Sequence, residues 1–341
     1  MILVTGGTGL IGAHLLYELV SQGHSVRALR RSSSSDRVVR KIFHYYAPDA
    51  EKLLKTITWC DGDITDRASL EAAFEGVEQV FHCAAVVSFD PKEEAHIIHT
   101  NVQSTQNIVA LCLSHGVQKL CHLSSVAALA RDHKATEVHL TEAAPLEFFE
   151  GASAYARSKA LAEQEVWKSM EKGLQAFIVN PTIVLGPGDW DKSSAKLFGT
   201  IWKGLKFYTE GSNSFVDVRD VATVMVQLMQ RDISGERFIV TAENLPFRTV
   251  FNGIADGLGV ARPSIKTTFW MGELAWRANA VLSFFTGKPP LLTRDAVAAA
   301  RKHYSFANEK VKQRLGFEFL SVEQSTEDTC RIFLKENEKS K

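Results

Sequence analysis

Tyr155 and Lys159 are the two residues whose types and spacing most directly indicate chemistry. They stand at the start of a predicted helix over residues 153–172, and a separation of four places both side chains on one helix face. A free tyrosine has a pKa of about 10, too high for efficient proton transfer at neutral pH, and a neighbouring ammonium lowers that pKa. The same spacing also occurs by chance on surface helices, so the pair needs support from elsewhere in the chain.

Two serines supply part of that support. Ser124 and Ser125 follow a predicted strand over residues 119–123. Ligands of doubly wound sheets bind at the carboxyl ends of the parallel strands. A hydroxyl at this position would hold a substrate oxygen for Tyr155.

A glycine-rich turn follows the first predicted strand and opens the first predicted helix. Gly7, Gly9 and Gly12 match the G-x-G-x-x-G spacing, while Gly6, Gly9 and Gly12 match a wider G-x-x-G-x-x-G spacing. Such a turn lets backbone N–H groups and the positive helix end approach the phosphates of a dinucleotide. Glycine turns also serve only to reverse the chain, but the place between strand and helix favours a dinucleotide site.

The end of the second predicted strand bears on which dinucleotide binds. An NAD enzyme usually carries Asp or Glu there for the ribose 2′-hydroxyl, whereas this chain has Arg30 and Arg31. A guanidinium donates charge-assisted hydrogen bonds to a 2′-phosphate, so we expect NADP(H) ahead of NAD(H), which stays possible. The alternative is two ordinary surface arginines. Asp63 and Ile64 close the third strand and suit an adenine, unless Asp63 is only a turn or capping residue.

The rest of the chain supplies the elements that must position these groups. Short apolar runs, typical of buried strands, alternate with amphipathic helical stretches. This alternation requires right-handed crossovers, so we predict an α/β fold with a doubly wound parallel sheet of the Rossmann type. The predicted strands are 2–4, 25–29, 56–60, 79–82, 119–123 and 176–179, and the predicted helices are 11–21, 67–75, 93–115 and 153–172.

The pattern loosens after Pro181. A strand over 215–218, a helix over 220–230 and a strand over 237–240 are followed by a mainly helical remainder. We therefore predict a nucleotide-binding Rossmann domain over residues 1–180, with later returns around 214–240. A smaller, mainly helical C-terminal substrate-binding lobe is predicted over residues 181–341.

Composition excludes several classes of protein. The 341 residues contain 39 Lys and Arg against 39 Asp and Glu, a balance that argues against nucleic-acid binding by phosphate neutralisation. Five scattered cysteines without a C-x-x-C motif fit neither a disulfide framework nor a zinc site, and predict a cytoplasmic protein. His96 and His99 share a helix face, but no further ligand has a matching spacing, so no metal is expected. The apolar stretch 269–285 contains charges and is too short for stable membrane insertion.

Together these motifs resemble the extended short-chain dehydrogenase/reductases, which include nucleotide-sugar epimerases and dehydratases, 3β-hydroxysteroid dehydrogenases and dihydroflavonol reductases. The resemblance covers nearly the whole chain. It is specific for the superfamily and much less so for the substrate. It rests on residues 5–12, Asp63-Ile64, 80–85, 101–107, Ser124-Ser125, 155–159, 180–182, 215–222 and 315–317.

The resemblance implies roles for individual residues. Ser125 would orient the substrate, Tyr155 would donate and accept the proton, and Lys159 would bind the ribose and activate Tyr155. Ser125 is preferred to Ser124 because the family's active serine is typically the last of the pair. Asn101 would complete the catalytic group by fixing its helix near the lysine. The residues expected to bind the cofactor are Gly6, Thr8, Gly9, Leu10, Ile11, Gly12, Arg30, Arg31, Asp63, Ile64, Ala84, Ala85, Tyr155, Lys159 and Pro181.

The resulting prediction is an NADP(H)-dependent oxidoreductase that interconverts a ketone and a secondary alcohol on a bulky small molecule. The alternatives are a nucleotide-sugar epimerase or dehydratase with retained NAD, and a catalytically silent NADP(H)-sensing regulator. Trp190 and Lys192 are expected to contact substrate, with a turn anchored by a buried Trp190 as the competing interpretation. The resemblance also implies a homodimer formed through helices 93–115 and 153–172.

Overall fold

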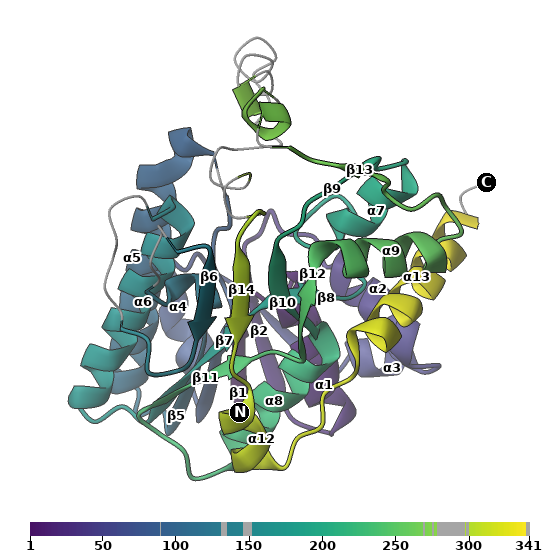
Figure 1. Cartoon of the computed structure of the whole chain (residues 1–341). Coiled ribbons are helices and arrows are strands. Elements are labelled where there is room, and N and C mark those ends of the chain that lie inside the picture. Colours follow the sequence, from purple (N-terminus) through teal and green to yellow (C-terminus); the bar gives the residue numbers. More distant parts are fainter. Residues whose placement is uncertain are drawn as a thin grey trace.

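The fold is seen in a computed structural model (Figure 1), which describes residues 1–88, 90–130, 135–145, 152–268, 270–274, 276–277, 297 and 300–338. Its centre is a seven-stranded sheet in which every neighbouring pair is parallel. The strand order is β11-β7-β5-β4-β1-β2-β3. The bounds are β1 Ile2–Thr5, β2 Val26–Arg30, β3 Thr58–Asp61, β4 Gln79–His82, β5 Lys119–Leu123, β7 Ala176–Pro181 and β11 Glu236–Val240.

Helices cover both faces of this sheet. One face carries α1, α2 and α8, and the other carries α4, α5 and α6. The bounds are α1 Leu10–Ser21, α2 Arg37–Tyr46, α3 Ala50–Leu54, α4 Arg67–Phe74, η1 Pro91–Glu93, α5 Glu94–Ser114, η2 Val126–Ala128, α6 Ala154–Glu171 and α8 Val218–Gln230. This is the doubly wound arrangement predicted from the alternation of strands and helices.

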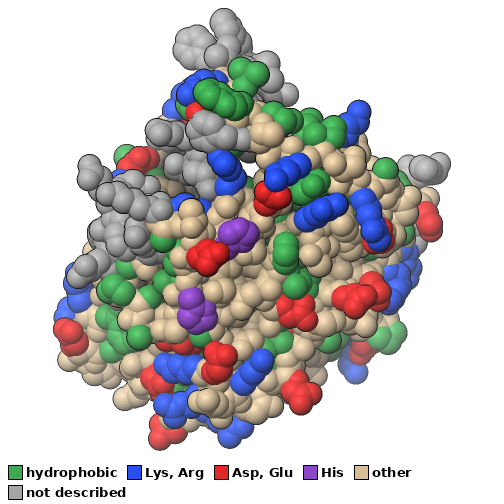
Figure 2. Space-filling view, in the orientation of Figure 1, with side chains coloured by type: hydrophobic (Ala, Val, Ile, Leu, Met, Phe, Trp, Pro, Cys, Tyr) green, Lys and Arg blue, Asp and Glu red, His purple; other side chains and the backbone are tan. Residues whose placement is uncertain are grey.

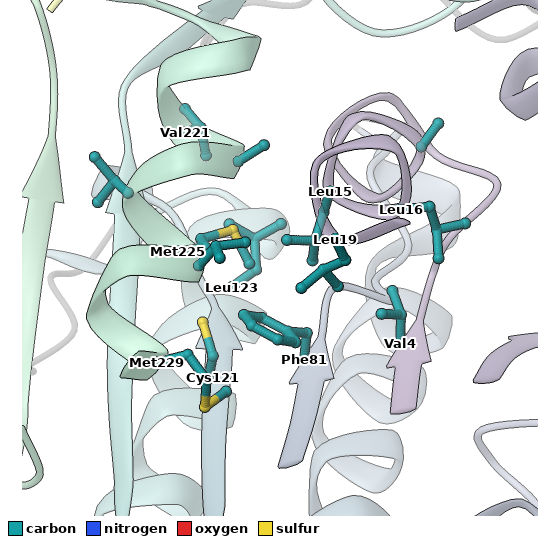
Figure 3. Close-up of a cluster of buried hydrophobic side chains, with 14 of the residues drawn as sticks. Val4, Leu15, Leu16, Leu19, Phe81, Cys121, Leu123, Val221, Met225 and Met229 are labelled. Atoms are coloured by element: carbon teal, nitrogen blue, oxygen red, sulfur yellow. The ribbon is translucent and has the colours of Figure 1, made fainter. Parts of the chain in front are cut away.

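Alternating strand residues build a separate core on each face, because successive side chains of a strand point to opposite sides. Figure 3 shows α1 and α8 meeting the sheet over Val4, Phe81 and Cys121. Their neighbours Leu3, Val80 and Leu120 pack against α4, α5 and α6 instead. Each fully buried Leu or Phe contributes about 1.5–3 kcal/mol, so these two layers fix the strand ends on which the site is built.

The structure also contains a second, smaller sheet, of which only one strand was predicted: the strand predicted over 215–218 overlaps β10. Its order is β12-β10-β14-β6, with β8 paired to β10. Only β12 runs antiparallel to its neighbour. The remaining bounds are β6 Glu137–Leu140, β8 Ile183–Leu185, α7 Lys196–Trp202, β9 Phe207–Tyr208, β10 Ser212–Asp217, β12 Glu243–Pro246, α9 Phe247–Gly257, β13 Ile265–Lys266, β14 His303–Phe306, α12 Glu309–Leu315 and α13 Val322–Glu338.

The sequence prediction agrees closely with the structure over residues 1–181. All six predicted strands are present within two residues at either end, but β3 was wrongly predicted to be buried. It is an edge strand whose residues are exposed or partly exposed. The strand predicted over 237–240 is β11, which joins the large sheet beside β7.

On the face shown in Figure 2, acidic and basic side chains are interspersed over the second sheet and its surroundings.

Candidate active site

The glycine-rich turn connects β1 to α1 and leaves no room for a Cβ at Gly6 or Gly12. Gly6 has φ +72°, and a Cβ there would lie 2.5 Å from the Ala84 nitrogen, while one on Gly12 would lie 2.2 Å from the Gly6 oxygen. The Gly9 N–H donates to the Gly6 oxygen (3.0 Å), and α1 then begins at Leu10 without a side-chain cap. Uncapped N–H groups at a positive helix end bind anions. The turn therefore fits the pyrophosphate of a dinucleotide.

Hydrogen bonds join this turn to the end of β4. The Thr5 hydroxyl lies 2.8 Å from Nδ1 of His82 and accepts from the Ala84 N–H (3.3 Å). The Cys83 N–H donates to the Thr5 carbonyl (3.1 Å). Ala84 and Ala85, both predicted to bind the cofactor, thus follow a strand end that is fixed beside the glycine turn.

Asn101 acts as a brace between two segments of the site. It is 2% exposed on α5; its Oδ1 accepts from the Val86 N–H (2.8 Å), and its Nδ2 donates to the Val86 carbonyl and the Ser158 hydroxyl (both 3.0 Å). These bonds hold the loop after β4 against α6. Asn101 is therefore placed to position neighbouring groups, and its side-chain amide forms hydrogen bonds to other groups of the protein.

The two arginines at the end of β2 have different surroundings. Arg30 pairs with Asp61 at the end of β3 (3.3 Å) and lies over the Trp59 ring, 5.0 Å from its centroid. Arg31 is exposed. At the strand end where an NAD enzyme usually carries an acidic residue, the chain therefore presents two cations, one of them already paired.

Asp63 makes the contacts of a turn residue, the competing interpretation made of it from the sequence. One of its oxygens accepts from the backbone N–H and the hydroxyl of Thr65 (2.8 and 2.7 Å), and these bonds lower the pKa of the carboxyl. Asp66 is the residue that caps α4, through the Ala68 N–H (3.1 Å). Asp63 is thus an ionised turn residue at the carboxyl end of β3, beside Ile64.

Tyr155 and Ser125 meet at the start of α6. The helix begins at Ala154, and the Ser153 hydroxyl caps it by accepting from the Ala156 N–H (3.2 Å). Tyr155 is hydrogen-bonded to the Ser125 side chain; burial raises the pKa of the phenol, and this bond opposes the rise. Spacing alone predicted a lowered pKa, so here the structure differs: desolvation outweighs the hydrogen bond with Ser125. The phenol is accordingly protonated at neutral pH.

Lys159 lies one turn further along α6. It is 4% exposed, and its ammonium donates to the carbonyl of Leu123 at the end of β5 (2.9 Å). Burial lowers the pKa of Lys159 to about 8, while Cys83 and Glu163 act in the opposite direction. The ammonium is thus held at the sheet edge between β4 and β5.

The sequence analysis missed two buried polar groups beside the site. On β4 and β5, His82 and His122 lie side by side with ring centroids 5.4 Å apart. Burial lowers the pKa of His82 to about 3 and that of His122 well below its usual value, so both rings are neutral. The second group is Glu163, Asn180 and Arg237. Glu163 continues the spacing of four from Tyr155 and Lys159, the one signal that could have revealed it.

The two residues predicted to contact substrate, Trp190 and Lys192, are both bonded to other side chains of the protein. Trp190 packs on Phe333 of α13 (ring centroids 5.0 Å apart), and its indole N–H donates to Glu336 (2.6 Å). This arrangement favours the competing interpretation, a turn anchored by a tryptophan. Lys192 is exposed and pairs with Asp189 (3.4 Å). Most of the apolar stretch 269–285 lies outside the described residues.

The sequence analysis also expected no metal site and no membrane-spanning helix. Within the described ranges, no group of three or more His, Cys, Asp or Glu side chains could hold a metal ion. No helix in that part of the chain is long and apolar enough to cross a membrane.

The sheet order and the glycine turn are those of a dinucleotide-binding α/β protein. A model of the NAD dependent epimerase/dehydratase family matches residues 2–241, and the chain belongs to this family. It is 30% identical to a putative dihydroflavonol 4-reductase of Synechocystis sp., over 97% of this chain and 93% of that protein.

Solved structures agree with this assignment. The crystal structure of gox2253 superposes with a TM-score of 0.80 at 28% identity and covers 98% of both chains. UDP-glucose 4-epimerase from Thermotoga maritima has a TM-score of 0.75 at 21% identity, over 98% of this chain and 99% of that one. The protein is therefore an NAD(P)-dependent enzyme of the extended short-chain dehydrogenase/reductase type, a group of reductases, epimerases and dehydratases that act on small molecules.

Proposed function

We propose that this enzyme is an NADP(H)-dependent reductase that converts a ketone on a bulky small molecule into a secondary alcohol. The observation that carries this proposal is the hydrogen-bonded pair of Ser125 and Tyr155, with a phenol that burial keeps protonated. A protonated phenol is a general acid, which is what reduction of a carbonyl requires. The similarity to a putative dihydroflavonol 4-reductase supports the same class of reaction.

In this mechanism each residue has one task. The Ser125 hydroxyl orients the carbonyl oxygen, and Tyr155 donates its proton to that oxygen as negative charge develops there. The ammonium of Lys159 binds the ribose and favours the phenolate that remains on Tyr155. The glycine turn would hold the cofactor, which supplies hydride when bound. Ala84, Ala85 and Pro181 would line it at the strand ends.

The preference for NADP(H) rests on Arg30 and Arg31. Replacing both with alanine should weaken NADPH binding roughly 10- to 100-fold, since a charge-assisted hydrogen bond is worth about 1.5–3 kcal/mol. NADH binding should change little, because NADH lacks the 2′-phosphate. Arg314→Ala provides a control, since Arg314 on α12 pairs with Glu236 on β11, at the other end of the sheet from β2. Fluorescence titration of each protein with both cofactors gives the comparison. A wild-type preference for NADH would contradict the NADP(H) assignment.

The second candidate function is a nucleotide-sugar epimerase or dehydratase that retains NAD, as the fold similarity to an epimerase allows. Such an enzyme returns the hydride to its substrate, so no net NADPH would be consumed. Mass spectrometry of the ligand retained on the purified protein separates the two functions. Retained NAD with a nucleotide sugar would favour the epimerase. A protein that binds NADP(H) tightly but turns over no carbonyl would instead be a regulator.

A homodimer completes the proposal. A surface groove of about 690 Å³ lies over α5 and α6, the two helices labelled at the left of Figure 1. Ile98, Val102 and Leu161 line it together with the ion pair of Arg157 and Glu94. Apolar residues between two neighbouring helices are what a four-helix dimer interface would bury. Light scattering should give a mass near twice 37.8 kDa, and Val102→Arg should halve it.

A further inference from the structure

A buried carboxylate lies one helical turn beyond Lys159. Glu163 is fully buried on α6 and follows Lys159 by four residues, as Lys159 follows Tyr155, so all three share one helix face. Moving an ionised carboxylate out of water costs several kcal/mol unless charges and hydrogen bonds compensate. The role of Glu163 is therefore to be found in its contacts.

One oxygen of Glu163 is linked to the loop that carries Ser125. Oε1 accepts from the side-chain amide of Asn180, and the same Asn180 nitrogen donates to the Ser125 carbonyl (3.0 Å). Asn180 is itself fully buried on β7. A single amide thus connects the carboxylate to the backbone of the proposed substrate-orienting serine. Ser124, 4% exposed, also lies against Glu163.

The other oxygen faces a cation that other groups hold in place. Oε2 lies 3.6 Å from Nη1 of Arg237 on β11, and neither atom has a hydrogen-bond partner among the described residues. The remaining guanidinium nitrogens donate to the carbonyls of Glu142 (2.8 Å) and Ala144. Arg237 is therefore a counter-charge near Glu163 and not a closely bonded partner. Because Arg237 neutralises the carboxylate only in part, the negative charge of Glu163 still stabilises the ammonium of Lys159.

Among the described residues that interact with Lys159, Glu163 is the one that supplies negative charge. Cys83, His82, His122 and Glu163 all interact electrostatically with the ammonium. Burial raises the pKa of the Cys83 thiol to about 12 and holds both histidines neutral. On the carboxylate itself, burial raises the pKa, while hydrogen bonds and nearby cations favour the ionised form. The groups that do so are Ser124, Arg237, Asn180 and Lys159.

We infer that Glu163 is a positioning residue: its carboxylate keeps the buried ammonium of Lys159 charged and, through Asn180, holds the Ser125 loop beside Tyr155. The inference rests on the proposed function, because the groups that Glu163 acts on are the ones assigned there. Glu163 touches neither substrate nor cofactor in this scheme.

Glu163→Gln tests the inference, since it keeps an oxygen for Asn180 and removes the charge. NADPH affinity of the wild type should fall as pH rises and Lys159 loses its proton. In Glu163→Gln this fall should occur about 1 pH unit lower, the small end of the range for an adjacent opposite charge. The midpoint should shift to lower pH whichever of Tyr155 and Lys159 loses its proton first. Removing the negative charge of Glu163 makes deprotonation of either group easier. Fluorescence titration with NADPH from pH 6 to 9 requires no substrate.

Matched variants separate charge from structure. Glu163→Asp keeps the charge and should keep the wild-type pH midpoint. Glu165→Gln removes a carboxylate from the same helix, where it pairs with Lys168 (2.8 Å), and should cause no shift. Arg237→Gln removes a positive charge, so the midpoint should move to higher pH, which gives a second test of opposite sign if Glu163→Gln does not fold.

The outcomes distinguish this inference from the proposed function. A folded Glu163→Gln protein with the wild-type pH midpoint would overturn the positioning role, as would a downward shift in Arg237→Gln. A wild-type protein that binds no NADPH at any pH would overturn the proposed function itself. A shift shared by Glu163→Gln and Glu163→Asp would also overturn the role, since shape and not charge would then be responsible.

Discussion

His82 should make the protein sensitive to acid. Its ring is 1% exposed, lies 2.8 Å from the Thr5 hydroxyl, and has a pKa that burial lowers to about 3. Because the unfolded imidazole titrates near 6.5, the unfolded chain takes up a proton that the folded chain does not. The free energy of unfolding is therefore lost progressively as the pH falls below about 6.5. Between pH 7 and pH 5 this single group should cost about 2 kcal/mol, and any folded pKa below about 4 gives the same figure.

Other groups titrate as well, so the measurement must be a difference between two proteins. Burial raises the pKa of Asp220 to about 7, and this carboxyl acts in the opposite sense, because the folded state then binds the extra proton. His82→Gln removes only the His82 contribution. The His82→Gln protein should have a lower free energy of unfolding than the wild type at pH 7. At pH 5 the difference between the two proteins should have shifted by about 2 kcal/mol in favour of the variant.

Urea unfolding at pH 7 and pH 5 gives the four free energies needed. Ile42→Val serves as the control, since it destabilises a fully buried site without a titrating group. Its difference from the wild type should be equal at the two pH values. If the His82→Gln difference were also constant, the fold would not hold the His82 imidazole neutral, which would contradict the assignment of a neutral ring to this buried histidine.

Three further predictions follow from the geometry. Tyr155→Phe removes only the phenolic oxygen, so NADPH should still bind while turnover falls about 10²–10⁴-fold, as measured by steady-state kinetics; unchanged turnover would exclude Tyr155 from the reaction. Gly12→Ala should abolish cofactor binding in a calorimetric titration, because its Cβ would lie 2.2 Å from the Gly6 oxygen; normal affinity would show that the turn can open. Arg219→Met should lower the melting temperature, since Arg219 joins Asp328 of α13 to α8 (3.0 Å), and an unchanged melting temperature would show that this ion pair does not stabilise the lobe.

The parts of the fold that the sequence predicted are those fixed by local pattern. The glycine turn and the strands before Gly6 and Ser124 follow from residue spacing that is visible within a few positions. The second sheet could not be found in this way. Its strands β6 and β14 pair 137–140 with 303–306. Because β6 is short and only Leu140 in it is buried, its sequence contains no run of apolar residues that would indicate a strand.

The candidate site was predictable in its members and less so in its electrostatics. Tyr155, Lys159 and the two serines follow from motif spacing, and the structure brings Ser125 to Tyr155. Spacing does not report burial, however, and burial determines the direction of the pKa shift on Tyr155. The role of Trp190 could not be predicted from nearby residues either, because its hydrogen-bond partner Glu336 lies on α13, the last helix of the chain.

The position of β11 has a consequence for how the chain is made. β7 is buried along its whole length, and β11 is the strand that covers its outer edge. During synthesis β7 leaves the ribosome well before residues 236–240, and at ~5–20 residues per second the intervening segment takes several seconds to emerge. For that time an apolar strand edge is open to any other nascent chain. A ribosome stalled late enough to release β7 but not β11 should therefore present a chaperone substrate, and one stalled late enough to release β11 should not.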